Sequence, residues 1–223
     1  MIIAKRKDLT EIGRMIAPYK RILILGCSTC TTVCSAGGPK ECRELAESLV
    51  AGRGDLYVEQ DMVPRQCAEK FVARFEGKVR DFEAVLSMAC GNGVQVMAKR
   101  FPNKPVLPAL NTEFIGIEKE PGVWTEMCRA CGDCILWRTA GICPVTRCAK
   151  GLLNGPCGGS REGRCEVSKD LPCAWQEIYQ GLKRLGLTDY LKSGVQIKSW
   201  AVHPGRLTKG DEKPKHGLTG VGV

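Results

Sequence analysis

The sequence has almost no histidine, no long apolar run and no recognisable export signal. His203 and His216 are the two histidines among 223 residues. No run of 18 apolar residues occurs, so we expect no transmembrane helix. The opening residues, MIIAKRKDLTEIGRMI, lack the apolar core and the small-residue cleavage site of a secretory signal, which predicts a cytoplasmic protein.

Catalytic signatures are equally scarce. No Walker motif, no complete G-x-G-x-x-G pattern and no Ser/His/Asp arrangement is visible. Because both histidines lie near the C-terminal end of the sequence, acid–base and hydrolytic catalysis have few candidate residues. We therefore expect no catalytic residue on this chain.

The net charge of +9 indicates an acidic partner. Nucleic acid would satisfy such a charge, but the basic residues are spread along the chain, without a recognition-helix pattern or interleaved aromatic residues. An acidic protein surface fits as well, because opposite potentials steer docking. We expect a protein partner, no nucleic acid and no membrane insertion.

Cysteine, in contrast, is abundant. Six of the fourteen cysteines lie between residues 27 and 90, and eight lie between residues 128 and 173. The cytosol keeps thiols reduced, so clustered cysteines there indicate metal sites or redox chemistry rather than a disulfide framework. Because both histidines follow the last cysteine, any site in these regions is expected to be all-thiolate, either Cys₄ zinc or iron–sulfur.

Four apolar runs of strand length alternate with helical patterns in residues 1–120. This alternation predicts a Rossmann-like α/β domain with a parallel sheet flanked by helices. The fourth run contains two prolines, which confine it to an edge or a strand end. The expected strands are residues 21–25, 56–60, 84–88 and 105–110, and the expected helices are residues 9–16, 39–49, 64–76 and 93–100.

Residues 121–200 have a different character. Glycine, proline and cysteine are frequent and apolar periodicity is lost, so this segment needs metal centres to hold it together. We predict an irregular cysteine-rich metal-cluster domain that is followed by one C-terminal amphipathic helix at residues 174–185. Residues 201–223 are polar and glycine-rich, which predicts a flexible tail.

The first cysteine set is expected to converge on the parallel sheet. Cys27 and Cys30 follow the first strand, Cys90 follows the third, and Cys67 is expected in the first turn of the helix after the second. These positions share the carboxyl edge, where open α/β folds bind ligands. They could hold one [4Fe–4S] cluster or one Cys₄ zinc. The alternatives are separate buried cysteines that act as small hydrophobes, or a thioredoxin-type pair of Cys27 and Cys30.

Two further cysteines in this region have roles outside this set of four or alternative to it. Cys42 lies at helical spacing from Leu45 and Leu49, which predicts a core position. Cys34 could replace one of the four ligands or line the loop.

The second cysteine set begins like a bacterial ferredoxin. Cys128-x₂-Cys131-x₂-Cys134 has the ferredoxin spacing, and a Cys-Pro pair follows at Cys143, later than usual. Eight thiols are enough for two four-ligand sites, whereas the alternative is a pair of structural zinc ribbons. Nearby glycines would let backbone amides approach the cluster sulfurs. The other members of the set are Cys148, Cys157, Cys165 and Cys173.

Together these motifs resemble a known family. They read GCSTCTTVCSAGGPKE, RQC, SMACGNGVQ, C-x₂-CGDC, GICPVTRCAKGLLNGPCGG, RCEV and CAW. They resemble the MetV family, the small cysteine-rich subunit of the methylenetetrahydrofolate reductase of acetogenic and related anaerobic bacteria. The second half alone resembles the methylenetetrahydrofolate reductase C-terminal domain, and the resemblance covers residues from about 5 to 190.

The resemblance implies an iron–sulfur electron-transfer subunit. Such a subunit takes electrons from ferredoxin or a larger electron-transfer complex and passes them to the flavin of the catalytic MetF subunit, which reduces methylenetetrahydrofolate to methyltetrahydrofolate. The flavin and folate sites would belong to MetF. The alternative is a Cys₄ zinc-binding structural or regulatory module of the same reductase.

The resemblance also implies the ligands. It implies two or three [4Fe–4S] sites, with zinc as an alternative in one of them, and it leaves the pairing within the second set open. We expect Cys128, Cys131 and Cys134 in one cluster with a distant fourth ligand. The implied ligands are Cys27, Cys30, Cys67, Cys90, Cys128, Cys131, Cys134, Cys143, Cys148, Cys157, Cys165 and Cys173.

Overall fold

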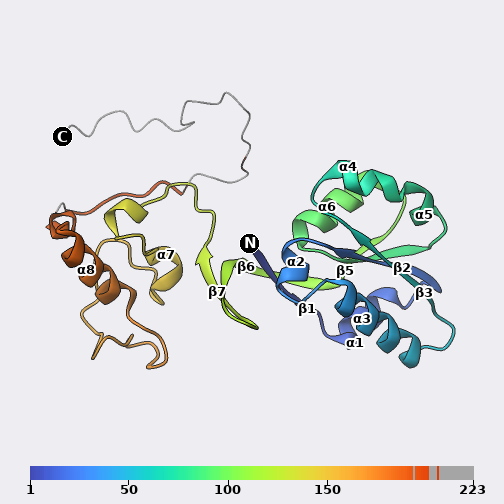
Figure 1. Cartoon of the computed structure of the whole chain (residues 1–223), viewed down its shortest axis with the longest axis horizontal. Coiled ribbons are helices and arrows are strands. Elements are labelled where there is room, and N and C mark those ends of the chain that lie inside the picture. The colour runs from blue at the N-terminus through green and yellow to red at the C-terminus, as the bar shows by residue number, and fades with distance from the viewer. Residues whose placement is uncertain (193, 201–204, 206–223) are drawn as a thin grey trace. The chain divides into compact units, whose positions relative to one another are not determined.

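The computed structural model describes residues 1–192, 194–200 and 205. It divides into two compact units, Met1–Glu126 and Met127–Val223 (Figure 1). The flexible tail predicted for residues 201–223 lies, apart from residue 205, outside the described residues. No helix in the described part of the chain is long and apolar enough to cross a bilayer.

The first unit is built on a four-stranded parallel sheet. Its strand order is β3-β2-β4-β5, so β5 is an edge strand that pairs with β4. This confirms that the proline-containing strand lies at an edge or a strand end. Proline has no backbone N–H to donate to a neighbouring strand, so it is tolerated where one side of the strand is unpaired. The strands are β2 (Arg21–Cys27), β3 (Tyr57–Val63), β4 (Ala84–Met88) and β5 (Val106–Pro108).

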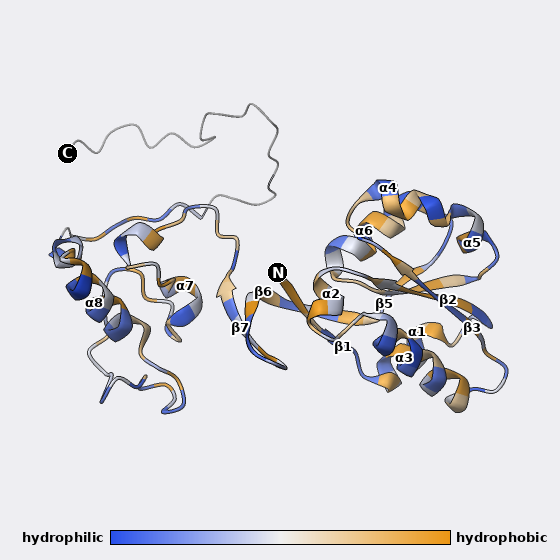
Figure 2. Cartoon of the chain, in the orientation of Figure 1, coloured by the Kyte–Doolittle hydropathy of each residue, from blue (hydrophilic) through white to orange (hydrophobic). Residues whose placement is uncertain are grey.

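Helices cover both faces of this sheet (Figure 1). In β2, Ile22 and Ile24 pack into the core beneath α1 and α3, whereas Leu23 and Leu25 pack into the core beneath α4, α5 and α6. A strand buried on both faces needs the continuous apolar run that the sequence shows. Each helix carries both hydrophobic and hydrophilic residues in Figure 2, as expected when one side of it faces a core. They are α1 (Leu9–Ile16), α3 (Pro39–Gly52), α4 (Glu69–Val72), α5 (Glu76–Arg80) and α6 (Gly91–Arg100).

A second sheet was not predicted from the sequence. It is antiparallel, with the order β1-β6-β7. In its first pair Ile2 lies opposite Ile115, and a register shift falls between Ile3 and Ala4. Gly122 has a φ of +79° in the turn between β6 and β7, which suits glycine. The strands are β1 (Ile2–Arg6), β6 (Leu110–Glu120) and β7 (Val123–Cys128).

The helix predicted for residues 64–76 is wrong in its start and its continuity. α4 begins at Glu69, and a 3₁₀ turn at Ala73–Phe75 separates it from α5. Cys67 therefore lies in the turn before the helix, not in its first turn. The physical reason is Gln66. Its side chain donates hydrogen bonds to the β2 carbonyl oxygens of Leu25 and Gly26, and these bonds keep the turn from adopting a helical conformation.

The second unit has little regular structure. Its short helical segments lead to α8 (Ala174–Leu185), which has the predicted bounds and ends at Gly186 with a φ of +69°. Trp175, Ile178 and Leu182 lie on one face of α8 and form a three-residue buried cluster. The irregular cysteine-rich region and the C-terminal helix are thus confirmed. The short segments are η2 (Leu136–Arg138), α7 (Pro144–Arg147) and η3 (Thr188–Lys192).

Candidate metal centres

The carboxyl edge of the parallel sheet gathers four of the predicted cysteines. Cys27 is the last residue of β2, and Cys30 begins the short helix α2 (Cys30–Val33). Cys67 lies in the turn after β3, and Cys90 is the N-cap of α6 just after β4. All fourteen cysteines of the chain are free thiols.

The Cys67 thiol has two other cysteines of this group as neighbours. Partial burial raises the pKa of the Cys67 thiol, and the neighbouring thiols of Cys90 and Cys27 raise this pKa further. Like charges at short range disfavour ionisation in this way unless a cation compensates them. The thiols of Cys27 and Cys90 therefore lie near the Cys67 thiol, and a shared metal site at this edge stays a prediction.

Cys30 has a different neighbour, Cys34. Burial raises the pKa of the Cys34 thiol, and the Cys30 thiol adds to the effect. The sulfur of Cys34 lies 3.7 Å from the carbonyl oxygens of Ala4 and Thr31, so its S–H donates to backbone acceptors. A buried thiol that serves as a donor is protonated, which favours a packing role for Cys34 over a ligand role.

Gln66 fixes the turn that carries Cys67. Its side chain is fully buried. Its Nε2 donates to the carbonyl oxygens of Leu25 at 2.8 Å and Gly26 at 2.9 Å, and its Oε1 accepts from the Ser87 hydroxyl at 2.7 Å. One side chain thus ties the Cys67 turn to the ends of β2 and β4. Sequence analysis missed Gln66, because nothing in its local pattern marks a buried amide.

Threonines brace the loop after β2. The Thr29 hydroxyl lies 3.3 Å from the Cys27 sulfur. The hydroxyls of Thr31 and Thr32 donate to the carbonyl oxygen of Cys27 at 3.3 Å and 2.7 Å. Gly37 approaches β4 so closely that a Cβ there would lie 1.9 Å from the Met88 carbonyl oxygen. The loop is therefore rigidly placed at the sheet edge.

Cys42 is a core residue, as predicted. It is 1% exposed, and burial raises the pKa of its thiol to about 12. Its sulfur lies 4.0 Å from the Met62 sulfur, and a Cβ at Gly26 would approach it to 2.7 Å. No space remains beside this thiol for a metal ligand sphere.

The second unit places four cysteines around one cavity. They come from four different positions: the C-cap of α7, two loops, and the N-cap of α8. Arg147 and Lys150 also line the cavity, and Trp175 contributes its buried ring. The four cysteines are Cys148, Cys157, Cys165 and Cys173.

Backbone hydrogen bonds hold these cysteines in place. The amide of Cys165 donates to the Leu171 carbonyl at 2.9 Å, and the amide of Cys173 donates to the Gly163 carbonyl at 2.8 Å. This tight fold of residues 161–173 brings Cys165 and Cys173 to the same cavity. The amide of Gly159 lies 3.4 Å from the Cys157 sulfur and donates to it.

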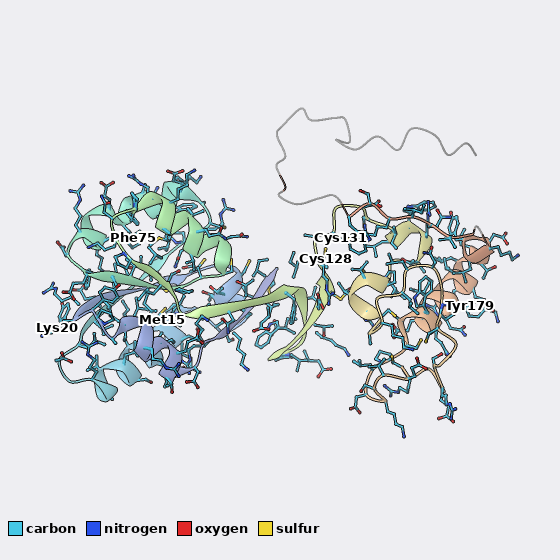
Figure 3. The ribbon with its side chains drawn as sticks, turned by 180° about the vertical axis from the view of Figure 1, so that it is seen from behind. Met15, Lys20, Phe75, Cys128, Cys131 and Tyr179 are labelled. Atoms are coloured by element: carbon cyan, nitrogen blue, oxygen red, sulfur yellow. The ribbon has the colours of Figure 1, made fainter. Side chains whose placement is uncertain are left out.

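The remaining four cysteines of this set lie around the start of the unit. Cys128 ends β7 and Cys143 is the N-cap of α7. The amide of Ala130 donates to the Cys128 sulfur at 3.3 Å, and Figure 3 shows Cys128 and Cys131 close together at the strand end. The Thr146 hydroxyl donates to the Met127 carbonyl at 3.3 Å, which joins α7 to this strand end. The four cysteines are Cys128, Cys131, Cys134 and Cys143.

The chemistry of both loops suits thiolate-bound metal. Amides that donate to sulfur stabilise the thiolate form, and such donors surround cluster sulfurs. Ala130 and Gly132 both have positive φ, +50° and +78°, and the Ala130 amide donates to the Cys128 sulfur. No three or more His, Cys, Asp or Glu side chains within the described residues form a ready metal-ligating group. The ligand set and the metal in each site therefore stay predictions.

Comparison with known proteins finds a family model that matches part of the chain. Residues 107–201 match the family model of the methylene-tetrahydrofolate reductase C-terminal domain. The match contains all eight cysteines of the second set and confirms the resemblance to a methylenetetrahydrofolate reductase family. No curated protein and no solved structure matches the chain.

Proposed function

We propose that this protein is the iron–sulfur electron-transfer subunit of a methylenetetrahydrofolate reductase complex. The observation that carries the proposal is the cavity lined by four cysteines inside the reductase-related domain. Four thiols around one space, with no histidine in the described residues, match the ligand set of a [4Fe–4S] cluster.

The proposal divides the second set into two ligand groups. Cys148, Cys157, Cys165 and Cys173 share the cavity, which leaves the other four cysteines for a second centre. In this division the fourth ligand of the ferredoxin-like run is Cys143. A third centre would use Cys27, Cys30, Cys67 and Cys90 at the sheet edge.

Surface access favours electron transfer over a purely structural role. Cys67, Cys128, Cys134 and Cys157 are exposed, so each proposed centre has at least one ligand at the protein surface. When bound, [4Fe–4S] clusters would supply one-electron chemistry. The chain's own amides at Ala130 and Gly159 would steady the thiolates by donating hydrogen bonds to them.

The partner in this proposal is the flavin-bearing catalytic subunit. The reductase-related domain is consistent with such a partner. The net charge of +9 would steer the chain toward an acidic surface on that subunit or on a ferredoxin-type donor. Substrate and flavin would bind to the partner, and this chain would deliver the electrons.

Metal analysis of cysteine variants tests the proposal. Protein purified without oxygen should contain iron and acid-labile sulfide in near-equal amounts. Cys165→Ser should lose about four iron atoms per chain, the content of one cluster. Cys42→Ser removes a buried thiol outside the proposed centres and should keep the full iron content. Zinc in place of iron, or equal iron in both variants, would reject the proposal.

A further inference from the structure

The segment 194–200 lies against the cysteine-rich loops of the second unit. Gln196 and Asn154 exchange two hydrogen bonds: the Gln196 amide donates to Asn154 Oδ1 at 2.7 Å, and Asn154 Nδ2 donates to the Gln196 carbonyl at 3.2 Å. The Arg138 guanidinium also donates to the Gln196 side chain. These contacts hold the segment against the loops of the second unit.

Lys198 is the most buried residue of this segment. Its side chain is only 3% exposed, which is unusual for lysine. Its ammonium donates to the main-chain carbonyl of Asp133 and lies 3.7 Å from the Asp133 carboxylate. The Ser199 amide donates to the same carboxylate at 3.3 Å. The ammonium also lies 5.1 Å from the centroid of the Trp200 ring.

The contact of Lys198 with Asp133 lies beside two of the predicted cluster ligands. Asp133 lies between Cys131 and Cys134, in the ferredoxin-like run. The Lys198 ammonium is therefore bonded to the backbone of the turn that links two proposed cluster ligands. Lys198 itself is 64 residues or more away in sequence and carries no ligand atom for the cluster.

The two charges of this pair are screened to different degrees. The Asp133 side chain is 46% exposed, so water screens its negative charge. The ammonium is almost completely buried, so water screens its positive charge much less. A buried cation needs compensation, and a cluster held by four thiolates would supply negative charge beside it.

We propose that Lys198 raises the reduction potential of the centre built on Cys128, Cys131 and Cys134. Reduction adds a negative charge to the cluster, and a nearby buried cation stabilises the reduced form more than the oxidised form. Local charge is one of the factors that set iron–sulfur potentials. This assignment rests on the proposed function, and it makes Lys198 a positioning residue that acts through the turn and is not a ligand.

A redox titration followed by EPR tests the assignment on the anaerobically purified full chain. Lys198→Met keeps the apolar stem and removes the charge, whereas Lys198→Arg keeps the charge. Lys192→Met is the control, because Lys192 is 77% exposed and pairs with Asp189. Asp133→Asn removes the opposing carboxylate and should shift the potential in the other direction.

The expected result is selective. Lys198→Met should lower the midpoint potential of one centre, with iron per chain and the other centres unchanged. A tenfold fall in its reduced fraction relative to its oxidised fraction corresponds to about 59 mV for one electron. Lys198→Arg and Lys192→Met should retain the original potential.

Two results would overturn the assignment alone. One is an unchanged potential in Lys198→Met, and the other is loss of iron in both Lys198 variants, which would make the residue a structural tether. An unmodified protein with no iron–sulfur signal would instead overturn the proposed function, and the assignment with it.

Discussion

The substitution Gln66→Leu should weaken the first unit and dismantle its proposed metal site together. Leucine has a similar volume but offers no polar atom to the sheet edge. The change removes three buried hydrogen bonds, two to the β2 carbonyl oxygens of Leu25 and Gly26 and one from Ser87. The turn with Cys67 would lose the side chain that ties it to both β2 and β4.

The expected loss in the free energy of unfolding follows from the number of hydrogen bonds removed. Each buried hydrogen bond contributes about 0.5–1.5 kcal/mol net, so three together contribute about 1.5–4.5 kcal/mol. Domains of this size unfold with about 5–15 kcal/mol, so the loss is a large share of the free energy of unfolding. Volume effects should be small, because the two side chains are close in size.

Urea unfolding monitored by hydrogen exchange of β2 and β4 peptides measures the first unit separately. The matched control is Gln95→Leu, because Gln95 is exposed on α6 and makes one hydrogen bond, to the Gly91 carbonyl at 3.1 Å. The control should change the free energy of unfolding by less than about 0.5 kcal/mol. If Gln66→Leu also stays within that limit, the bonds at the sheet edge do not hold the turn, and the reasoning is refuted.

Three further predictions concern packing, thiol reactivity and metal removal. Gly93→Ala should destabilise by about 1–3 kcal/mol in urea unfolding, because the new Cβ would lie 2.8 Å from the Gln66 Cβ, whereas Gly13→Ala meets nothing within 4 Å and should stabilise. Cys42 should resist alkylation at pH 8 until urea is added, because a pKa of about 12 leaves roughly one thiolate in ten thousand; modification of the folded protein, seen by peptide mass mapping, would contradict this. Anaerobic metal removal should abolish hydrogen-exchange protection of α8 while β2 stays protected, because the α8 core has only three buried residues; a protected α8 would refute the role of metal in folding this unit.

The sequence predicted the parallel sheet because its signals are local. The run ILIL in β2 and the run AVLSM in β4 are buried on both faces, so they lack the alternation that could be confused with other structures. Topology then placed Cys27 and Cys90 at one edge without any further information. The amphipathic helix α8 was equally clear, since its apolar residues repeat at helical spacing.

The parts that were missed depend on distant partners. β1 pairs with β6, more than 100 residues later, and short half-exposed strands of this kind carry a weak pattern. Gln66 and Lys198 are polar residues whose burial results from tertiary contacts. The grouping of Cys148 with Cys173 likewise comes from the folding of the loop between them. Spacing along the chain could not specify any of these.

The EPR spectrum of the anaerobically purified, dithionite-reduced protein shows directly whether the chain holds [4Fe–4S] clusters. We expect low-temperature signals of reduced [4Fe–4S] clusters, with one signal lost in Cys165→Ser and none lost in Cys42→Ser. A silent spectrum from protein that contains only zinc would contradict it.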